Sequence, residues 1–543
     1  MSDFTFTDEQ IDAINYAKNM VITACPGSGK TTVIAEKIRK EIDSLRDYQG
    51  VIGITFTVKA SSELKKRVKK GGFRIKNSFF GTIDHFCLSE IIYPFCRRVF
   101  SSVSDSIECV SYYELDDTTK VELTNTFSCI SIEYLKDNFQ PISEYFLSKG
   151  IVFLEVLGLL ALHILENSTS CRKYINSRYK SVYIDEYQDS SLEQHHLFSK
   201  LVNELSLKGV VVGDINQSIY AWRGSNSQYI ADLISATNFQ HFTVNINHRC
   251  HPSIINYSKA LYNPKTDLIA VDDIRIYHIH VDGTQKDIVN RIDSIIEKLL
   301  EKKYITSVED IAILVRNNAT LEYFQGILKH PHVVYNENPL LSKNSFVTKL
   351  LSLLISYRFS SKILITEVIE FIRSFKTLKP SEVGAIRKLV SSIRDTAQEN
   401  LSSHIVKVAE TTIVRSLTET EFEAFTKVIG DDNFIKQYND DDKSVQIMTL
   451  HKAKGLEFKA VFHLDLYDWI FPAREFISGS YEPHFKDYAQ DLNLHYVGVT
   501  RAEEYCFLLS SSYRYNRYNE VKQGKTSQFL SLESLRELRH SHN

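Results

Sequence analysis

The stretch TACPGSGKTT, residues 23–32, contains the residue types that bind nucleotide phosphates. Its glycines would let the backbone approach the phosphates, Lys30 would reach the β- and γ-phosphates, and Thr31 would place its hydroxyl on Mg²⁺. A strand-like run precedes the stretch and helical spacing follows it, so we interpret it as a phosphate loop rather than a surface turn. We expect its nucleotide-binding residues to be Ala24, Pro26, Gly27, Ser28, Gly29, Lys30, Thr31 and Thr32.

Two adjacent carboxylates end a second apolar run, VYIDEYQD. In an open parallel sheet, ligands lie at the carboxyl ends of the strands. There Asp185 would hold Mg²⁺ and Glu186 would polarise the water that attacks the γ-phosphate. A third run, VVVGDINQSIY, contains Gln217, whose amide would reach the γ-phosphate or the attacking water. The alternatives are an exposed acidic turn for the carboxylates and a surface amide for Gln217.

The bulk properties limit the class of protein. The chain has 543 residues, 43% apolar and 24% charged, which is ordinary for several globular domains. A formal net charge of −3 argues against a polyanion binder held by bulk charge, but it is compatible with a local basic groove. The eight scattered cysteines and the acidic N-terminus favour a cytoplasmic protein. No apolar run has the length of a membrane span.

The candidate residues must be positioned by strands that end at one edge of a sheet. Strand-like and helical runs alternate along most of the chain, which predicts parallel sheets covered by helices. This alternation is interrupted twice, and both interrupting segments have a helical pattern. We therefore expect an α/β fold with two domains, each interrupted by a mainly helical insertion. The first domain is expected at residues 1–92 and 179–245 with an insertion at 93–178, and the second at 246–325 and 443–543 with an insertion at 326–442.

The motifs occur in an order that resembles the UvrD/Rep/PcrA-type helicases of superfamily one. The run consists of FTDEQIDAI, TACPGSGKTT, ITFTVKASSELKKRV, GTIDHF, YIDEYQDSS, VGDINQSIYAWRGS, INHRC, VQIMTLHKAKGLEFKAVF and HYVGVTRAEE, and it spans nearly the whole chain. In this family an alanine usually replaces the first glycine of the phosphate loop, so Ala24 is no defect. The resemblance implies two RecA-like lobes with ATP between them.

The resemblance also assigns roles around the nucleotide. Gln10 would read the adenine, Glu457 would contact the ribose, and Gly455 would allow close approach of the backbone. Arg249 and Arg501 would act as arginine fingers from the second lobe, so hydrolysis would depend on closure of the lobes. The alternative for each arginine is a surface ion pair. The catalytic set is then expected to be Lys30, Glu186, Gln217, Arg249 and Arg501, with ATP and Mg²⁺ as cofactors.

Members of this family stack aromatic side chains on the bases of single-stranded DNA. The matching positions are Phe56, Tyr220 and Trp222, with His85 beside the strand, although Phe56 and Trp222 could instead belong to a core. The expected neighbours of the DNA phosphates are Lys59, Arg223 and His451. The basic run KKRVKK is either a further DNA contact or a solvated helix face, and the sequence does not decide between them.

The sequence departs from the family pattern on both sides of the adenine. The fourth motif usually reads Asn-Tyr-Arg, whereas here His248 stands in place of the stacking tyrosine. The residue after the phosphate-loop threonine is often an arginine, and here it is Thr32. Because the phosphate chemistry is intact and the adenine clamp is weakened, we expect loose selectivity for the base.

Both insertions are short for the processive members of the family, which suggests a trimmed motor. Such a chain fits the helicase-like subunit of a Gabija-type anti-phage system, where the expected partner is a nuclease-type protein. The leading hypothesis is an ATPase that moves 3′ to 5′ on single-stranded or tailed DNA. The alternatives are a regulatory subunit that senses DNA or nucleotide and licenses a partner nuclease, and an RNA-directed motor.

Overall fold

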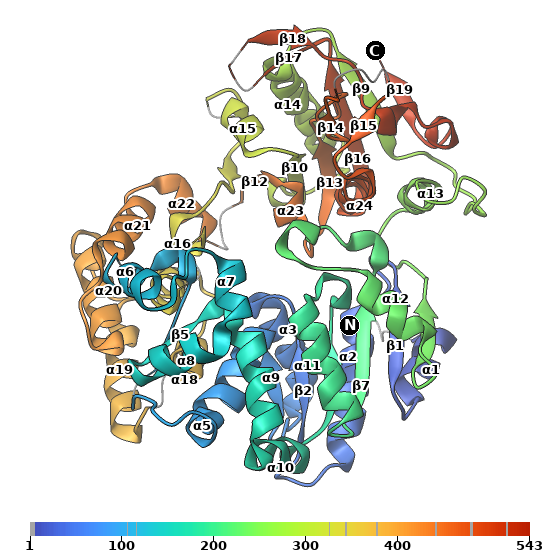
Figure 1. Ribbon diagram of the computed structural model, residues 1–543. Coiled ribbons are helices and arrows are strands. Elements are labelled where there is room, and N and C mark those ends of the chain that lie inside the picture. The colour runs from blue at the N-terminus through green and yellow to red at the C-terminus, as the bar shows by residue number, and fades with distance from the viewer. Residues whose placement is uncertain are drawn as a thin grey trace.

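The computed structural model describes residues 6–105, 107–115, 117–324, 326–342, 345–375, 378–439, 443–477, 482–516, 518 and 520–542. Two lobes built on large sheets lie one above the other in Figure 1, and a helical body lies beside the lower lobe. The expected α/β class with two parallel sheets is confirmed. No helix within the described ranges is long and apolar enough to cross a membrane.

The first lobe contains a parallel sheet in the order β3-β2-β6-β7-β1-β8. Its strands are β1 (Met20–Ala24), β2 (Gly50–Ile54), β3 (Phe79–Gly81), β6 (Tyr179–Ile184), β7 (Lys208–Gly213) and β8 (Gln240–Val244). Its main helices are α1 (Asp8–Asn15), α2 (Lys30–Ser44), α3 (Val58–Lys69), α4 (Ile83–Phe86), α11 (Leu192–Asn203) and α12 (Gln228–Ser235). Because β6, β7 and β1 are neighbours, the loops that follow them meet at one edge.

The second lobe contains a parallel sheet in the order β11-β12-β10-β13-β16-β9-β19. Its strands are β9 (Ile276–Val281), β10 (Ile311–Val315), β11 (His332–Val334), β12 (Val445–Thr449), β13 (Phe458–His463), β16 (Ala502–Ser511) and β19 (His540–His542). Its helices include α13 (Pro252–Ala260), α14 (Gln285–Glu301), α15 (Asn318–Leu321), α23 (Leu450–Ala453) and α24 (Tyr488–Val499). Strand β10 is buried along its whole length, as its run of apolar residues requires.

The first insertion is mainly helical and has a small core of its own. Its helices are α5 (Tyr93–Phe95), α6 (Asp117–Phe127), α7 (Ile132–Asp137), α8 (Phe139–Ser148), α9 (Leu157–Asn167) and α10 (Thr169–Arg178). It also holds the parallel pair β4 (Glu108–Val110) and β5 (Ile151–Phe153), which the sequence did not predict. Strands this short show no clear alternation of apolar and polar residues.

The second insertion is a helical bundle around a separate apolar core. Its helices are α16 (Pro339–Ser342), α17 (Phe346–Phe359), α18 (Ile365–Phe375), α19 (Pro380–Ser392), α20 (Gln398–Ile413), α21 (Glu419–Ile429) and α22 (Asp432–Gln437). The expected start of this insertion at residue 326 is too early, because β11 lies after that point and pairs with β12 in the second sheet. The strand is short, and its signal was lost among the neighbouring loops.

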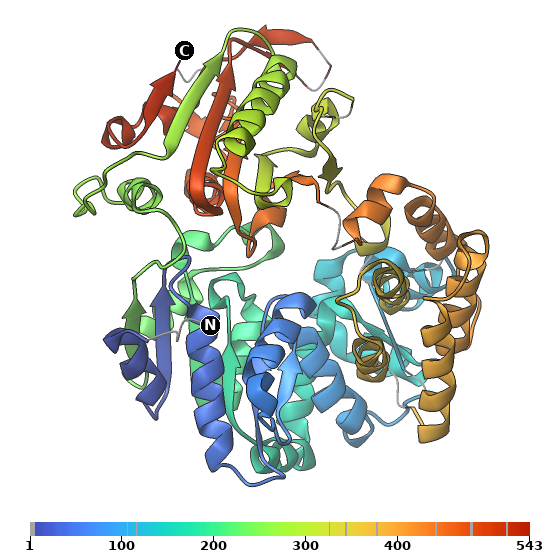
Figure 2. The same cartoon turned by 180° about the vertical axis from the view of Figure 1, so that it is seen from behind.

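The second insertion lies against the first lobe, as Figure 2 shows from behind. Two salt bridges join α3 to α18, from Lys65 to Glu370 at 2.7 Å and from Lys66 to Glu367 at 3.0 Å. The basic run that the sequence left undecided therefore contacts an acidic face within the same chain. This finding replaces both sequence-based interpretations at these two lysines.

Candidate functional site

The phosphate loop lies between the end of β1 and the start of α2. Gly27 and Gly29 have φ angles of 71° and 77°, a left-handed conformation that glycine adopts without strain. A Cβ atom on Gly27 would lie 2.4 Å from Oδ1 of Asn247, so no larger side chain fits there. The Ser28 side chain is fully buried, and its hydroxyl donates to the Cys25 carbonyl at 2.8 Å. The result is a narrow backbone cradle at a helix N-terminus.

The structure brings the expected phosphate and magnesium residues together. Lys30 Nζ lies 3.4 Å from Oε1 of Glu186, and Thr31 Oγ1 lies 3.5 Å from Oδ2 of Asp185. Burial disfavours the charge of Lys30, but the carboxylates of Glu186, Asp214 and Asp185 outweigh it and raise its pKa. Burial and the neighbouring Glu186 raise the pKa of Asp185.

Gln188 is a member of the site that the sequence analysis missed. Its side chain is fully buried, and its amide donates to Oε2 of Glu186 at 2.6 Å. Its carbonyl oxygen accepts the backbone N–H of Asp214 at 3.0 Å. Gln188 therefore fixes the orientation of Glu186 and ties it to the loop after β7. The sequence feature that could have indicated Gln188 is its position in YIDEYQD, two residues after Glu186.

Gln217 lies between the two lobes and is buried. Its amide donates to Asp214 at 2.8 Å within the first lobe, and its carbonyl oxygen accepts from Arg501 of the second lobe at 3.4 Å. Arg501 is 2% exposed and also donates to the carbonyls of Val497 and Leu456. Burial and the nearby Arg249 lower the pKa of Arg501 to about 10, and the guanidinium stays charged at neutral pH.

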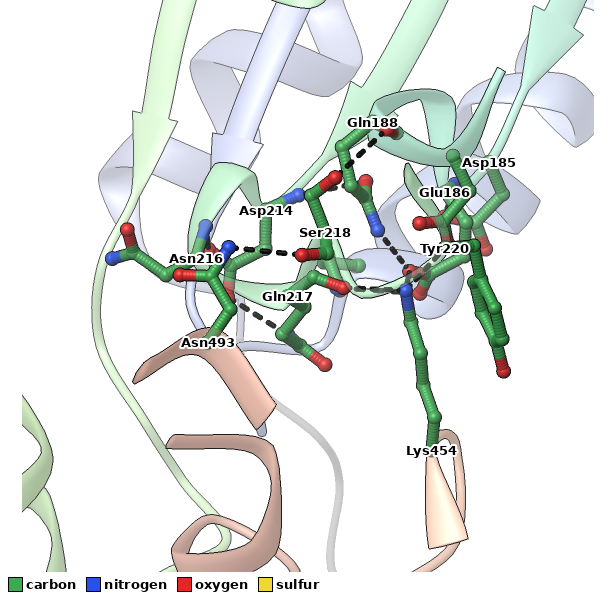
Figure 3. A network of polar contacts seen from close by, with 12 residues as sticks. Asp185, Glu186, Gln188, Asp214, Asn216, Gln217, Ser218, Tyr220, Lys454 and Asn493 are labelled. Atoms are coloured by element: carbon green, nitrogen blue, oxygen red, sulfur yellow. Dashed lines mark hydrogen bonds and ion pairs between the residues drawn. The ribbon is translucent and has the colours of Figure 1, made fainter. Parts of the chain in front are cut away.

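Lys454 is the second site residue that the sequence analysis missed, and Figure 3 shows it reaching up from the second lobe. Its Nζ forms an ion pair with the buried Asp189 and donates to the Gln217 carbonyl at 2.6 Å. It also lies 3.8 Å from Oε2 of Glu186. The sequence feature that could have indicated Lys454 is its position directly before Gly455 in the fifth motif. Lys454 thus connects the second lobe to the catalytic carboxylates of the first lobe.

Arg249 and its neighbours face the phosphate loop from the other side. Asn247 Oδ1 accepts from the backbone N–H of Arg249 at 2.8 Å, and His248 N–H donates to the Gly27 carbonyl at 3.0 Å. The Arg249 guanidinium pairs with Glu457 at 2.5 Å. The two residues expected to act separately on phosphate and ribose therefore form an ion pair in this structure.

The residues expected around the adenine make hydrogen bonds within the first lobe. Gln10 is buried, accepts from Thr7 N–H at 3.0 Å and donates to the Ser28 carbonyl at 2.9 Å, so it joins α1 to the phosphate loop. The Thr32 hydroxyl accepts from Arg67 of α3 at 3.0 Å. Gly455 has a φ of 84°, and a Cβ there would meet no neighbour within 4 Å. The loop that follows Lys454 therefore requires glycine for its conformation and not for space.

The expected DNA-contacting aromatics form a platform between the lobes. The Phe56 and Tyr220 rings stack at 5.3 Å with an interplanar angle of 17°, and the His451 ring lies 6.2 Å from Tyr220. Trp222 is 62% exposed, which excludes the alternative of a core residue. His85 contacts the Phe79 ring instead, at 5.0 Å, and burial together with Lys65 lowers its pKa to about 4. 

The two remaining expected DNA contacts are basic. Lys59 is exposed in the first turn of α3, where its ammonium group is accessible to a phosphate. The backbone of Arg223 lies in a short helix after Tyr220, but its side chain is outside the described part of the structure.

The donor groups fit a nucleotide with a magnesium ion. The hydroxyl of Thr31 and the carboxylate of Asp185 are hard oxygen donors of the kind that Mg²⁺ prefers. The cradle beside them excludes any Cβ at Gly27 and presents backbone N–H groups. Among the described residues, Asp189 Oδ1 has no hydrogen-bond partner, while Oδ2 of the same carboxylate pairs with Lys454. 

Comparison with known proteins agrees with this geometry. The UvrD/REP helicase N-terminal domain matches residues 6–144 and 133–238, and the UvrD-like helicase C-terminal domain matches residues 359–513. The chain therefore belongs to the UvrD-like helicases, as its motif order suggested.

Several relatives align over nearly the whole chain. The Gabija protein GajB of Bacillus cereus (strain VD045) is 28% identical over 93% of this chain and 95% of its own length. The ATP-dependent DNA helicase Rep of Buchnera aphidicola is 23% identical over 94% of this chain and 95% of its own. The helicase PcrA of Staphylococcus aureus is 23% identical over 93% and 83%, respectively.

Proposed function

We propose that this protein is a DNA-dependent ATPase that couples hydrolysis to 3′-to-5′ movement along single-stranded DNA. The observation that carries the proposal is the continuity between two sets of residues. Lys454 connects the buried set around Lys30, Glu186 and Gln217 to the aromatic platform of Phe56 and Tyr220, because its Nζ donates to the Gln217 carbonyl and lies 5.2 Å from the centroid of the Tyr220 ring. Membership of a helicase family indicates the class of reaction, and the site indicates which residues would carry it out.

The chain's own groups divide the catalytic work. Lys30 and the loop backbone would bind the phosphates, and Thr31 with Asp185 would hold Mg²⁺, which when bound neutralises phosphate charge. The Glu186 carboxylate would accept a hydrogen bond from the attacking water. Burial opposes its charge, but Lys30 and Lys454 lower its pKa, so it is ionised at neutral pH. The hydrogen bond from Gln188 fixes its orientation.

Arg501 and Arg249 would meet the charge that develops on the transferring phosphoryl group. Both belong to the second lobe or its entry loop, so their approach depends on closure. Arg501 already contacts Gln217 in the first lobe. Arg249 would exchange its pair with Glu457 for the phosphate, which would free Glu457 to contact the ribose.

We further propose that the protein works within an anti-phage complex and has a nuclease-type partner. The similarity to a Gabija protein over 95% of that protein's length supports this role. Under the second candidate function, the same ATPase senses DNA or nucleotide and activates the partner, with little unwinding of its own. The docked second insertion favours this candidate, because it restrains one lobe of the motor.

ATP hydrolysis with and without single-stranded DNA tests the proposal. We expect DNA to stimulate wild-type turnover about tenfold or more, and Glu186→Gln to lower stimulated turnover by about a thousandfold with nucleotide binding retained. Strand displacement on 3′-tailed and 5′-tailed duplexes then tests direction, and only the 3′-tailed duplex should open. Turnover that is indifferent to DNA would contradict the proposal. Stimulated turnover without displacement would favour the regulatory function.

A further inference from the structure

A short loop of the first lobe links the nucleotide chemistry to the aromatic platform. It follows β7 and runs from Ile215 to Ala221. Gln217 lies near one end, bonded to Asp214 and Arg501, and Tyr220 lies at the other end, stacked on Phe56. Only two residues separate Gln217 from Tyr220 in the chain. A displacement at one end of this loop therefore moves the other end.

The second lobe makes apolar and polar contacts with this loop, although the loop belongs to the first lobe. The Ile219 side chain is 0% exposed and lies within the apolar core of the second lobe. The Gln217 carbonyl accepts from Lys454, and the Ala221 N–H donates to Gln490 Oε1 at 3.1 Å. The loop is thus bonded to the second lobe as well as to the first, where the Ser218 hydroxyl donates to the Gln188 carbonyl at 3.3 Å.

Asn493 makes the central polar contact between the second lobe and this loop, as Figure 3 shows. Its amide donates to the Ser218 carbonyl at 2.9 Å and to the Ile215 carbonyl at 3.4 Å. Its own carbonyl oxygen accepts from the Tyr262 hydroxyl at 2.6 Å. The tyrosine hydroxyl needs an acceptor, so it directs the oxygen of Asn493 toward itself and the amide toward the loop.

The element that carries Asn493 also leads to the nucleotide. Helix α24 holds Gln490 and Asn493, and Arg501 follows its end. A helix of 12 residues is about 18 Å long and moves as one body. When Arg501 approaches the phosphates, Asn493 must therefore move as well and carry the loop with it.

We propose that Asn493, oriented by Tyr262, is a positioning residue that couples closure on the nucleotide to the aromatic platform. The inference rests on the proposed function, because the platform is assigned to single-stranded DNA there. Among the described residues, the hydrogen bonds of Asn493 go to the loop backbone and to Tyr262. Its loss should therefore impair the response to DNA more than it impairs basal hydrolysis.

The test compares three variants of the full-length chain. Asn493→Asp keeps the shape but replaces the amide donor with a carboxylate that faces two carbonyls. Tyr262→Phe removes the orienting hydroxyl together with its weaker contact to the Asn216 carbonyl at 3.4 Å. Asn290→Asp, on the exposed side of α14, matches the charge change elsewhere in the second lobe. The readouts are basal turnover, turnover with saturating 40-mer oligo(dT), the KM for ATP, and the thermal midpoint.

We expect Asn493→Asp to lower the ratio of stimulated to basal turnover about tenfold, with basal turnover and KM within about twofold of wild type. Tyr262→Phe should lower the same ratio about threefold, and Asn290→Asp should leave it unchanged. A full DNA response in both site variants would overturn the inference and leave the proposed function intact. A parallel loss of basal and stimulated turnover would also overturn it. A wild-type enzyme without any DNA response would instead defeat the proposed function.

Discussion

Single residues decide how the two lobes meet at the nucleotide edge, and Lys454 is the clearest case. Asp189 is 3% exposed, and burial raises its pKa to about 6 while Lys454 opposes that shift. Removal of the lysine would leave a buried carboxylate without its partner, which is costly. The cost falls on the closed arrangement of the lobes, because Lys454 and Asp189 come from different lobes.

We expect Lys454→Met to lower stimulated turnover by about a hundredfold and to lower the thermal midpoint. Adding Asp189→Asn should recover part of the loss, since the unpaired charge is then gone, and a double-mutant cycle measures that coupling. Lys452→Met is the matched control, because its Nζ donates to the carbonyls of Tyr335 and Asn336 within the second lobe. Equal effects at both lysines would contradict this account.

The sequence predicted the residues whose chemistry is local. Lys30, Thr31, Asp185 and Glu186 stand in motifs with a known spacing, and they meet because parallel strands end at one edge. No motif spacing used in the sequence analysis assigns a role to Gln188 or Lys454. The contact from Lys454 to Gln217 spans 237 residues and depends on how the lobes face each other, which no local pattern encodes.

At the scale of elements, the sequence predicted long, periodic segments and missed short ones. Strands such as β10, apolar throughout, were evident, whereas β4, β5 and β11 have three residues each. A short strand is stabilised by its neighbours in the sheet and not by its own pattern.

The packing of α24 on β13 contains a pH-sensitive pair of histidines. His463 and His495 are both fully buried, and their rings are joined by a hydrogen bond of 3.0 Å from Nδ1 of one to Nε2 of the other. His463 Nδ1 donates to the Leu464 carbonyl, and the Tyr257 hydroxyl lies 3.4 Å from His495 Nε2. Both rings are therefore neutral. Burial lowers the pKa of His463 to about 4, and burial, His463 and Arg539 hold the pKa of His495 well below its ordinary value.

A histidine whose pKa is lowered by folding stabilises the protein above its unfolded pKa, near 6.5. That contribution is lost as the pH falls from 6.5 toward 4. We expect the free energy of unfolding to drop by about 1 kcal/mol per histidine between pH 7.5 and 5.5. Urea denaturation at both pH values measures it. His463→Gln/His495→Gln should reduce the dependence by the share of these two histidines, and His196→Gln, exposed on α11, should keep it. An unchanged slope in the double variant would contradict the assignment.

At the scale of the molecule, the second insertion is held on the first lobe by charges near the surface. Glu370 is 58% exposed and Lys66 is 56% exposed, so each salt bridge is weak and screened by salt. A third pair, Arg415 to Glu108 at 3.2 Å, joins the second insertion to the first. These ion pairs therefore oppose undocking only weakly, and undocking would release the lysines of α3 from their acidic partners.

We expect Glu367→Lys/Glu370→Lys to release the insertion, because each new lysine faces a lysine of α3. Release adds phosphate-binding charge beside Lys59, so affinity for single-stranded DNA should rise about tenfold at low salt and fall more steeply with salt concentration. Fluorescence anisotropy over a salt series measures both, and small-angle scattering should show a larger radius of gyration. Glu399→Lys/Glu423→Lys makes the same net charge change on exposed positions of α20 and α21. If this control binds DNA as tightly as the test variant, bulk charge explains the gain and docking of the insertion does not restrain the motor.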